Sequence, residues 1–285
     1  MPIKDVLIKQ VEEKKNKKPV VVYCIADVNN FPYALTMIKT LRKFHDWDVY
    51  LYTNETTPEK IKLLPKNVTI KDLNPYLQDM GFFYRATPIL AEELLIDYEL
   101  VIKIDADSLI LGDLSALIKT TDYDVATVIN WNRMDEKFYP LVSGWGILPF
   151  EYFNCGFVAM RSRIFAHHWK VLCYTEQFNR MQFKEQDLLN AICYFGNYNV
   201  RCLDFANKDI ELNDWYGLIS KGELSRAIVK DGKIIIPKGL GNQPFPPTDI
   251  WVHAIQMAGG VEGKKDNWQI LFSPESMERV KELMK

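Results

Sequence analysis

The chain has 285 residues, enough to bury a sizeable core without disulfides. Its composition, with 48% hydrophobic and 25% charged residues, is ordinary for a globular protein. The formal net charge of -2 excludes a general nucleic-acid binder, which needs a basic excess to neutralise phosphates. The five cysteines lack CxxC spacing, the N-terminus lacks the apolar core of a secretory signal, and no apolar run reaches the ~18 residues of a membrane helix. We therefore expect a cytoplasmic protein with no transmembrane segment and no nucleic-acid partner.

The first half of the chain alternates apolar strand-like runs with helical patterns. The run 20–26 contains three valines and no charge, which is typical of a strand buried on both faces. The predicted strands are 20–26, 49–53, 68–70, 100–104 and 125–129, and the predicted helices are 31–44, 58–64 and 86–95. This alternation predicts right-handed crossovers and a mostly parallel central sheet with helices on both faces.

The second half is less regular. Residues 131–152 resemble an aromatic loop. The elements predicted after it are a strand at 157–160, helices at 163–178 and 185–195, a short strand at 250–253 and a helix that begins at Ser273. No Gly/Ser linker separates the two halves, so we expect a single Rossmann-like α/β domain over residues 1–285.

Three Asp-x-Asp triplets occur, at 46–48, 105–107 and 122–124, and chance alone gives about one in a chain of this length. Their positions distinguish them, because ligands of open α/β sheets bind beyond the carboxyl ends of strands. Only Asp105 and Asp107 directly follow a predicted strand. The other two triplets precede one.

Asp105 and Asp107 also lie between two apolar runs, where carboxylates are costly unless something neutralises them. Mg²⁺ or Mn²⁺ would do so and would complete its shell with phosphate oxygens and water, and Ala106 leaves the turn uncluttered. His253, at the end of a predicted strand, is a candidate third ligand, and its nitrogen would favour Mn²⁺. The alternative is a loop-stabilising carboxylate pair and a structural histidine.

Together with their neighbours, these residues resemble the retaining glycosyltransferases of family 8, the glycogenin and galactinol-synthase group, which have a GT-A fold. The resemblance runs from about residue 20 to residue 268. It rests on four segments: FYRATPIL at 83–90, VIKIDADSLIL at 101–111, FNCGF at 153–157 and KEQDLLN at 184–190. Each segment is of moderate specificity, and their order together is stronger evidence. Glu185 stands where the family usually has Asp.

The resemblance implies an enzyme that transfers a hexose from a UDP-sugar to a hydroxyl acceptor with retention, using a metal held by Asp105, Asp107 and His253. It implies a nucleotide-binding half at 1–130 and an acceptor and sugar half at 131–285. The catalytic candidates are Gln186, Glu185 and Asn154. The donor-binding candidates are Ala26, Asp27, Asn30, Arg85, Asp105, Ala106, Asp107, Cys155 and Lys264.

Gln186 is a neutral amide and therefore a poor base, which suits front-face retention. Inversion would need a carboxylate to deprotonate the acceptor, and Glu185 is the candidate for that role. The expected partners are a UDP-sugar and a glycan, polyol or protein acceptor, with a homodimer left open. The alternative functions are a nucleotidyltransferase, disfavoured because no Gly-rich basic loop follows the first strand, and a catalytically degenerate GT-A domain that binds sugar or a protein.

Overall fold

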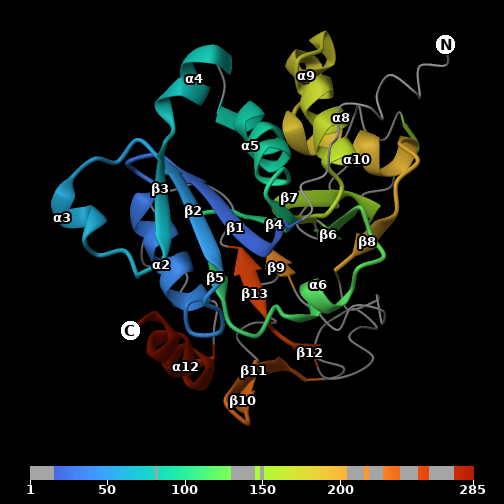
Figure 1. The fold of residues 1–285 in the computed structure, drawn as a ribbon. Coiled ribbons are helices and arrows are strands. Elements are labelled where there is room, and N and C mark those ends of the chain that lie inside the picture. Colours follow the sequence, from blue (N-terminus) through green and yellow to red (C-terminus); the bar gives the residue numbers. More distant parts are fainter. Residues whose placement is uncertain are drawn as a thin grey trace.

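The computed structural model describes residues 16–80, 83–129, 145–147, 151–203, 215–217, 227–237, 250–256 and 273–285. At its centre is a seven-stranded sheet of order β3-β2-β1-β4-β7-β6-β8 (Figure 1). The strands are β1 Lys18–Ala26, β2 Asp48–Thr53, β3 Val68–Asp72, β4 Tyr98–Ile104, β6 Val125–Ile129, β7 Phe153–Met160 and β8 Val200–Cys202. Strand β7 is antiparallel to β4 and β6, and the other pairings in this sheet are parallel. The predicted mostly parallel sheet is confirmed.

Helices cover both faces of this sheet, as predicted (Figure 1). One face carries α2 (Phe31–Leu41), and the other carries α5 (Ala86–Leu94), α8 (Arg163–Cys173) and α10 (Glu185–Phe195). The residues of β1 alternate between the two. Val20 and Val22 pack into the core beneath α2, while Val21 and Tyr23 pack into the core beneath the other three helices. This two-sided burial explains why the strand is a continuous apolar run.

Five predicted strands in the first half form within two residues of their predicted bounds. Other predictions need correction. The predicted helix 163–178 is two helices, α8 and α9 (Glu176–Arg180), and the predicted strand 250–253 is two strands, β12 (Ile250–Trp251) and β13 (Ala254–Gln256). The remaining helices are α3 Pro58–Ile61, α4 Asn74–Met80, η1 Phe83–Arg85, α6 Ala116–Lys119 and α12 Pro274–Met284. The predicted aromatic loop lies mostly outside the described residues.

Two small sheets lie beside the central one. In the first, β13 pairs antiparallel with β5 (Ser108–Ile110) and parallel with β9 (Trp215–Gly217). Its register sets Gln256 opposite Ser108, so the segment after Asp107 lies against a strand from near the C-terminus. The second small sheet contains β10 (Ile228–Lys230), β11 (Lys233–Ile236) and β12, and α12 packs against it. Ser273 caps α12 as predicted, because its side chain accepts a hydrogen bond from Ser276 N (3.1 Å).

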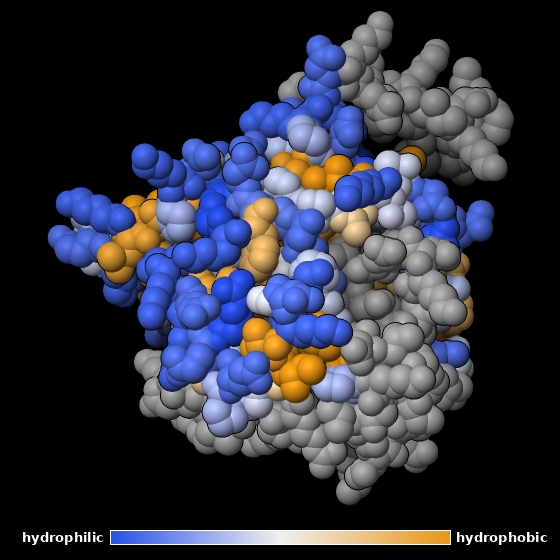
Figure 2. Space-filling model, turned by 90° about the horizontal axis from the view of Figure 1, so that it is seen from below, coloured by the Kyte–Doolittle hydropathy of each residue, from blue (hydrophilic) through white to orange (hydrophobic). Residues whose placement is uncertain are grey.

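Figure 2 shows the face seen from below in Figure 1. Hydrophilic residues cover most of its coloured area, and apolar residues form separate groups among them. Within the described residues, no helix combines the length and apolar character that crossing a membrane requires.

Candidate functional site

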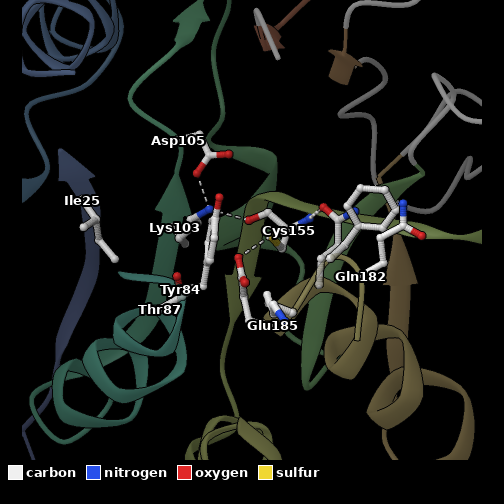
Figure 3. A pocket seen from close by; sticks show the side chains of 11 residues that line it. Ile25, Tyr84, Thr87, Lys103, Asp105, Cys155, Gln182 and Glu185 are labelled. Atoms are coloured by element: carbon white, nitrogen blue, oxygen red, sulfur yellow. Dashed lines mark hydrogen bonds and ion pairs between the residues drawn. The ribbon is translucent and has the colours of Figure 1, made fainter. Parts of the chain in front are cut away.

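A cavity of about 230 Å³ opens at the edge of the central sheet where β4 ends and β7 begins (Figure 3). Because β7 runs antiparallel to its neighbours, its first residues reach the edge at which the parallel strands finish. The cavity walls include Lys103 and Asp105 from the β4 segment, Cys155 from β7, and Glu185 and Gln186 from the first turn of α10. The structure therefore brings together three of the four sequence segments that carry the resemblance, and Tyr84 and Thr87 add the fourth.

Lys103 places a buried ammonium group in this cavity, and it was not predicted. Its Nζ donates to Asp105 Oδ1 and to Cys155 O (2.7 Å), so it joins β4 to β7 (Figure 3). Burial lowers the pKa of Lys103, but the charge of Asp105 and the other acceptors together raise it above its ordinary value. The lysine therefore stays charged and balances one carboxylate. A lysine inside the apolar run VIKI was the available sequence signal.

Asp105 and Asp107 share a second partner, Gln256 of β13. The Asp105 backbone N–H donates to Gly156 O (2.8 Å), and its Oδ2 accepts from Gln256 Nε2. Burial and the charge of Asp105 raise the pKa of Asp107 to about 7, although a hydrogen bond from Gln256 acts in the opposite direction. Gln256 Oε1 is buried and has no hydrogen-bond partner among the described residues. The sequence prediction missed Gln256.

His253, the predicted third metal ligand, lies between β12 and β13. Its Nδ1 donates to Trp251 O (2.9 Å), its ring lies 4.1 Å from the Trp251 ring, and its backbone oxygen accepts from Leu111 N (2.7 Å). Among the residues that the structure describes, no group of three or more His, Cys, Asp and Glu side chains is arranged to hold a metal ion. The β13 register brings Gln256, three positions later, to Asp105, and the role of His253 as a metal ligand stays a prediction.

The carboxylates nevertheless fit a hard divalent cation. Of the two partly buried carboxylates, Asp105 pairs with the Lys103 ammonium group, and Asp107 feels the charge of that group. The buried carbonyl oxygen of Gln256 has no partner in the described part of the chain, and its amide nitrogen donates to Asp105. Carboxylate and amide oxygens are the ligands that Mg²⁺ and similar ions prefer. Asp105 and Asp107 are therefore candidate residues for holding such an ion.

A bulge in β7 carries Cys155 into the cavity. The register with β6 shifts between Thr127 and Val128. On either side of the extra residues, Asn154 O (2.7 Å) and Phe157 O (3.0 Å) both lie within hydrogen-bond distance of Thr127 Oγ1, whose single hydrogen they share. The Asn154 side chain accepts from Gly156 N and so holds the turn within the bulge. Asn154, a predicted catalytic residue, is 8% exposed and shapes the backbone here.

Glu185 brings a buried carboxyl group to the cavity. Lys184, immediately before α10, has φ 49°, an uncommon backbone conformation that directs the first helical turn toward the cavity. Glu185 Oε1 accepts from Cys155 Sγ (3.3 Å), and Oε2 is buried without a partner among the described residues. Burial raises the pKa of Glu185 to about 8, although the charge of Lys103 opposes this shift. The carboxyl group is therefore mostly protonated at neutral pH.

Gln186 is held by a network that joins α10 to β7. Its Oε1 accepts from Cys155 N (3.0 Å), and its Nε2 donates to Tyr152 OH (3.3 Å). One turn later, Asn190 accepts from Phe153 N (2.7 Å) and donates to Phe153 O (2.9 Å). These contacts give a physical reason for the Q-x-x-x-N spacing of the segment EQDLLN, since its polar side chains fix the cavity wall.

Three further donor candidates have structural partners. Arg85 Nε donates to Cys173 O (2.9 Å) and its guanidinium lies 4.4 Å from the Phe178 ring centre, while Tyr84 and Thr87 line the cavity. Asp27 Oδ1 accepts from the backbone and side-chain nitrogens of Asn30 (both 2.8 Å), which shapes the turn before α2. Ala26 and Ala106 are buried in the core on the α2 side. Lys264 lies outside the described residues. No observation tests these donor assignments, which remain predictions.

Solved structures share this architecture. A galactosyltransferase LgtC in complex with donor and acceptor sugar analogues has 15% sequence identity and a TM-score of 0.62, with 93% of this chain and 95% of that chain covered. An active-site mutant of LgtC has 16% identity and a TM-score of 0.61, covering 92% and 94%. The bifunctional glycosyltransferase WbbM has 16% identity and a TM-score of 0.54, covering 95% of this chain and 52% of that one. The fold is the GT-A fold.

No family profile and no curated protein sequence matches the chain. At identities of 15–16%, the likeness to these GT-A structures concerns the fold. It confirms the GT-A prediction for the sheet and its covering helices. What the chain does must be argued from the cavity.

Proposed function

We propose that this protein is a cation-assisted glycosyltransferase that transfers a hexose from a UDP-sugar to a hydroxyl acceptor with retention. One observation carries the proposal: on a GT-A fold, the cavity at the carboxyl edge of the sheet joins the Asp105 carboxylate to an uncharged amide, Gln186. In open α/β sheets this edge is the usual ligand site. The LgtC structures come from a galactosyltransferase with bound donor and acceptor sugar analogues, which is consistent with sugar transfer at this edge.

Transfer breaks the bond between the sugar and a diphosphate, so negative charge develops on the leaving group. A bound divalent cation supplies electrostatic stabilisation of that charge. Asp105, Asp107 and Gln256 would hold the ion, and Lys103 balances Asp105 within the protein. Lys264 remains a proposed diphosphate contact.

The other side of the cavity suits the hexose. The Gln186 carbonyl is fixed by Cys155 N and borders the cavity, where it can face the electron-poor anomeric carbon. Glu185 is protonated at neutral pH and can donate a hydrogen bond to a sugar hydroxyl, but a protonated carboxyl group is no base. This state supports retention over the inverting role that the sequence left open for Glu185.

The test is an assay of UDP release and product formation with UDP-glucose and UDP-galactose, Mg²⁺ or Mn²⁺, and a panel of sugar and polyol acceptors. We expect divalent-dependent turnover and a product whose NMR coupling shows an α-linkage. A β-linked product would contradict retention. Cation-dependent UDP-sugar binding without any turnover would instead identify a GT-A binding domain, and sugar 1-phosphate activation by a nucleoside triphosphate would identify a nucleotidyltransferase.

A further inference from the structure

We propose that Gln256 is the third protein ligand of an all-oxygen cation site with Asp105 and Asp107, and that this site takes Mg²⁺ at least as readily as Mn²⁺. The proposal concerns the same cavity edge as the proposed function and rests on it for its biological meaning. It differs from the sequence expectation, in which the nitrogen of His253 completed the site and favoured Mn²⁺.

The Gln256 amide contacts both aspartates, and its carbonyl oxygen is buried without a partner in the described part of the chain. A buried amide oxygen that lacks a hydrogen bond is costly, and a cation beside the carboxylates would satisfy it. A half-turn of the terminal amide exchanges Oε1 and Nε2, so the oxygen can face the carboxylates when an ion replaces the hydrogen bond.

The fold fixes the position of the Gln256 side chain. The β13 register sets Gln256 opposite Ser108, the residue after Asp107. A Cβ on Gly156 would come within 2.5 Å of the Gln256 amide, so the bulge of β7 leaves room for this side chain only because residue 156 is glycine. Two separate elements therefore hold the amide against the carboxylates.

The charge and the ligand atoms of this cluster also suit a hard divalent cation. When both are ionised, Asp105 and Asp107 carry two negative charges beside the single ammonium group of Lys103, so a divalent cation can offset the excess. Its oxygens belong to two carboxylates and one amide. Hard oxygen ligands suit Mg²⁺, whereas a histidine nitrogen shifts preference toward transition metals such as Mn²⁺.

The experiment measures metal binding without sugar nucleotide. Free Mn²⁺ is counted by electron paramagnetic resonance during titration of the full chain, and Mg²⁺ is then added as a competitor to obtain both dissociation constants. Gln256→Leu should weaken binding of both ions about ten- to a hundredfold. Gln256→His should tighten Mn²⁺ relative to Mg²⁺ by about tenfold or more, because it adds a nitrogen ligand.

His253→Gln is the matched control, since it removes an imidazole three residues away and leaves an amide. It should change both constants by less than about twofold. Circular dichroism confirms folding, and Gln256→Asn replaces Gln256→Leu if the latter does not fold, with the same loss expected from its shorter reach. Unchanged constants in the Gln256 variants, or a loss in His253→Gln as large as theirs, would overturn the proposal. Since no UDP-sugar is present, this result is independent of whether transfer is found.

Discussion

Asp48 and Asp105 lie at opposite edges of the same sheet and differ in what surrounds them. At the edge where the parallel strands begin, Asp48 accepts from Lys18 Nζ (2.8 Å) and Tyr98 OH (2.7 Å), and these contacts lower its pKa. Asp124, at the same edge, accepts from Asn199 N (2.8 Å). At the other edge, Asp105 faces a buried lysine and a buried amide. The same Asp-x-Asp spacing therefore has two roles. At one edge the aspartates make stabilising surface contacts, and at the other Asp105 lines a cavity large enough for a ligand.

The largest effect is expected from a substitution at the edge that carries the cavity, and it tests whether only that edge binds ligand. Asp107→Asn is nearly isosteric but removes one charge from the proposed cation site. We expect a loss of turnover of about a hundred- to thousandfold, the usual consequence of removing one electrostatic element that stabilises a transition state. The measurement is the rate of UDP release at saturating cation, with circular dichroism as the folding control. If Asp48→Asn or Asp124→Asn lost as much activity while folded, the assignment of the ligand site to the edge with Asp105 and Asp107 would be wrong.

The next effect concerns Glu185. Because burial raises its pKa from 4.5 to about 8, the native chain keeps a proton that the unfolded chain releases over this range. The free energy of unfolding should therefore fall as pH rises from about 4.5 to about 8. Glu185→Gln has no carboxyl group to titrate, so its stability relative to the parent should rise by roughly 3 kcal/mol between pH 4 and pH 7.

Urea unfolding at several pH values measures this difference. Glu176→Gln is the control, since the Glu176 side chain is 89% exposed, and its stability relative to the parent should vary little with pH. A flat difference for Glu185→Gln as well would show that the cavity does not hold this carboxyl group in its protonated form.

A smaller effect is expected from the buried ammonium group of Lys103. Lys103→Met removes the ammonium group that neutralises Asp105 and should lower the free energy of unfolding by about 2 kcal/mol, because Asp105 loses a charged hydrogen bond but remains partly solvated. Mg²⁺ should restore part of that loss, since a cation can replace the missing charge. Thermal unfolding with and without Mg²⁺ measures both effects. Equal stability of variant and parent would contradict the charge balance described for the cavity.

The smallest effect belongs to the other edge. Asp48→Asn should cost less than about 1 kcal/mol in urea unfolding at neutral pH, because the Lys18 and Asp48 side chains are 63% and 41% exposed and such ion pairs contribute little. Turnover in Asp48→Asn and Asp124→Asn should change by less than about threefold, since both residues lie at the edge away from ligands. A larger stability loss would mean that the Tyr98 hydrogen bond matters more than the ion pair, which Tyr98→Phe would show.

The sequence predicted what is local or repeated along the chain. Burial on both faces makes Val20–Ala26 uniformly apolar, a serine followed by proline begins α12, and EQDLLN begins α10 where expected. The position of Asp105 after β4 was predictable for the same reason. Such features are encoded in neighbouring residues.

Features that depend on pairing between distant segments were not predictable. Histidine is a familiar metal ligand and glutamine is not, so the sequence drew attention to His253, although only the register of β13 against β5 decides which residue reaches the carboxylates. The pairing of Lys103 with Asp105 and Cys155 depends equally on β7 lying beside β4. Nor does the segment around Arg85 indicate that this side chain packs against Phe178.

The contact between Gln256 and Asp105 spans 151 residues of sequence, which has a consequence during synthesis. A chain emerging from the ribosome presents β4 and its aspartates long before β13 exists, and folding proceeds largely in that order. Until the C-terminal segment is made and the long loop closes, the carboxylates lack their amide partner. Cation capture at the proposed site would thereby be coupled to completion of the chain, so a nascent or truncated chain can have the central sheet and still bind the ion more weakly than the full chain.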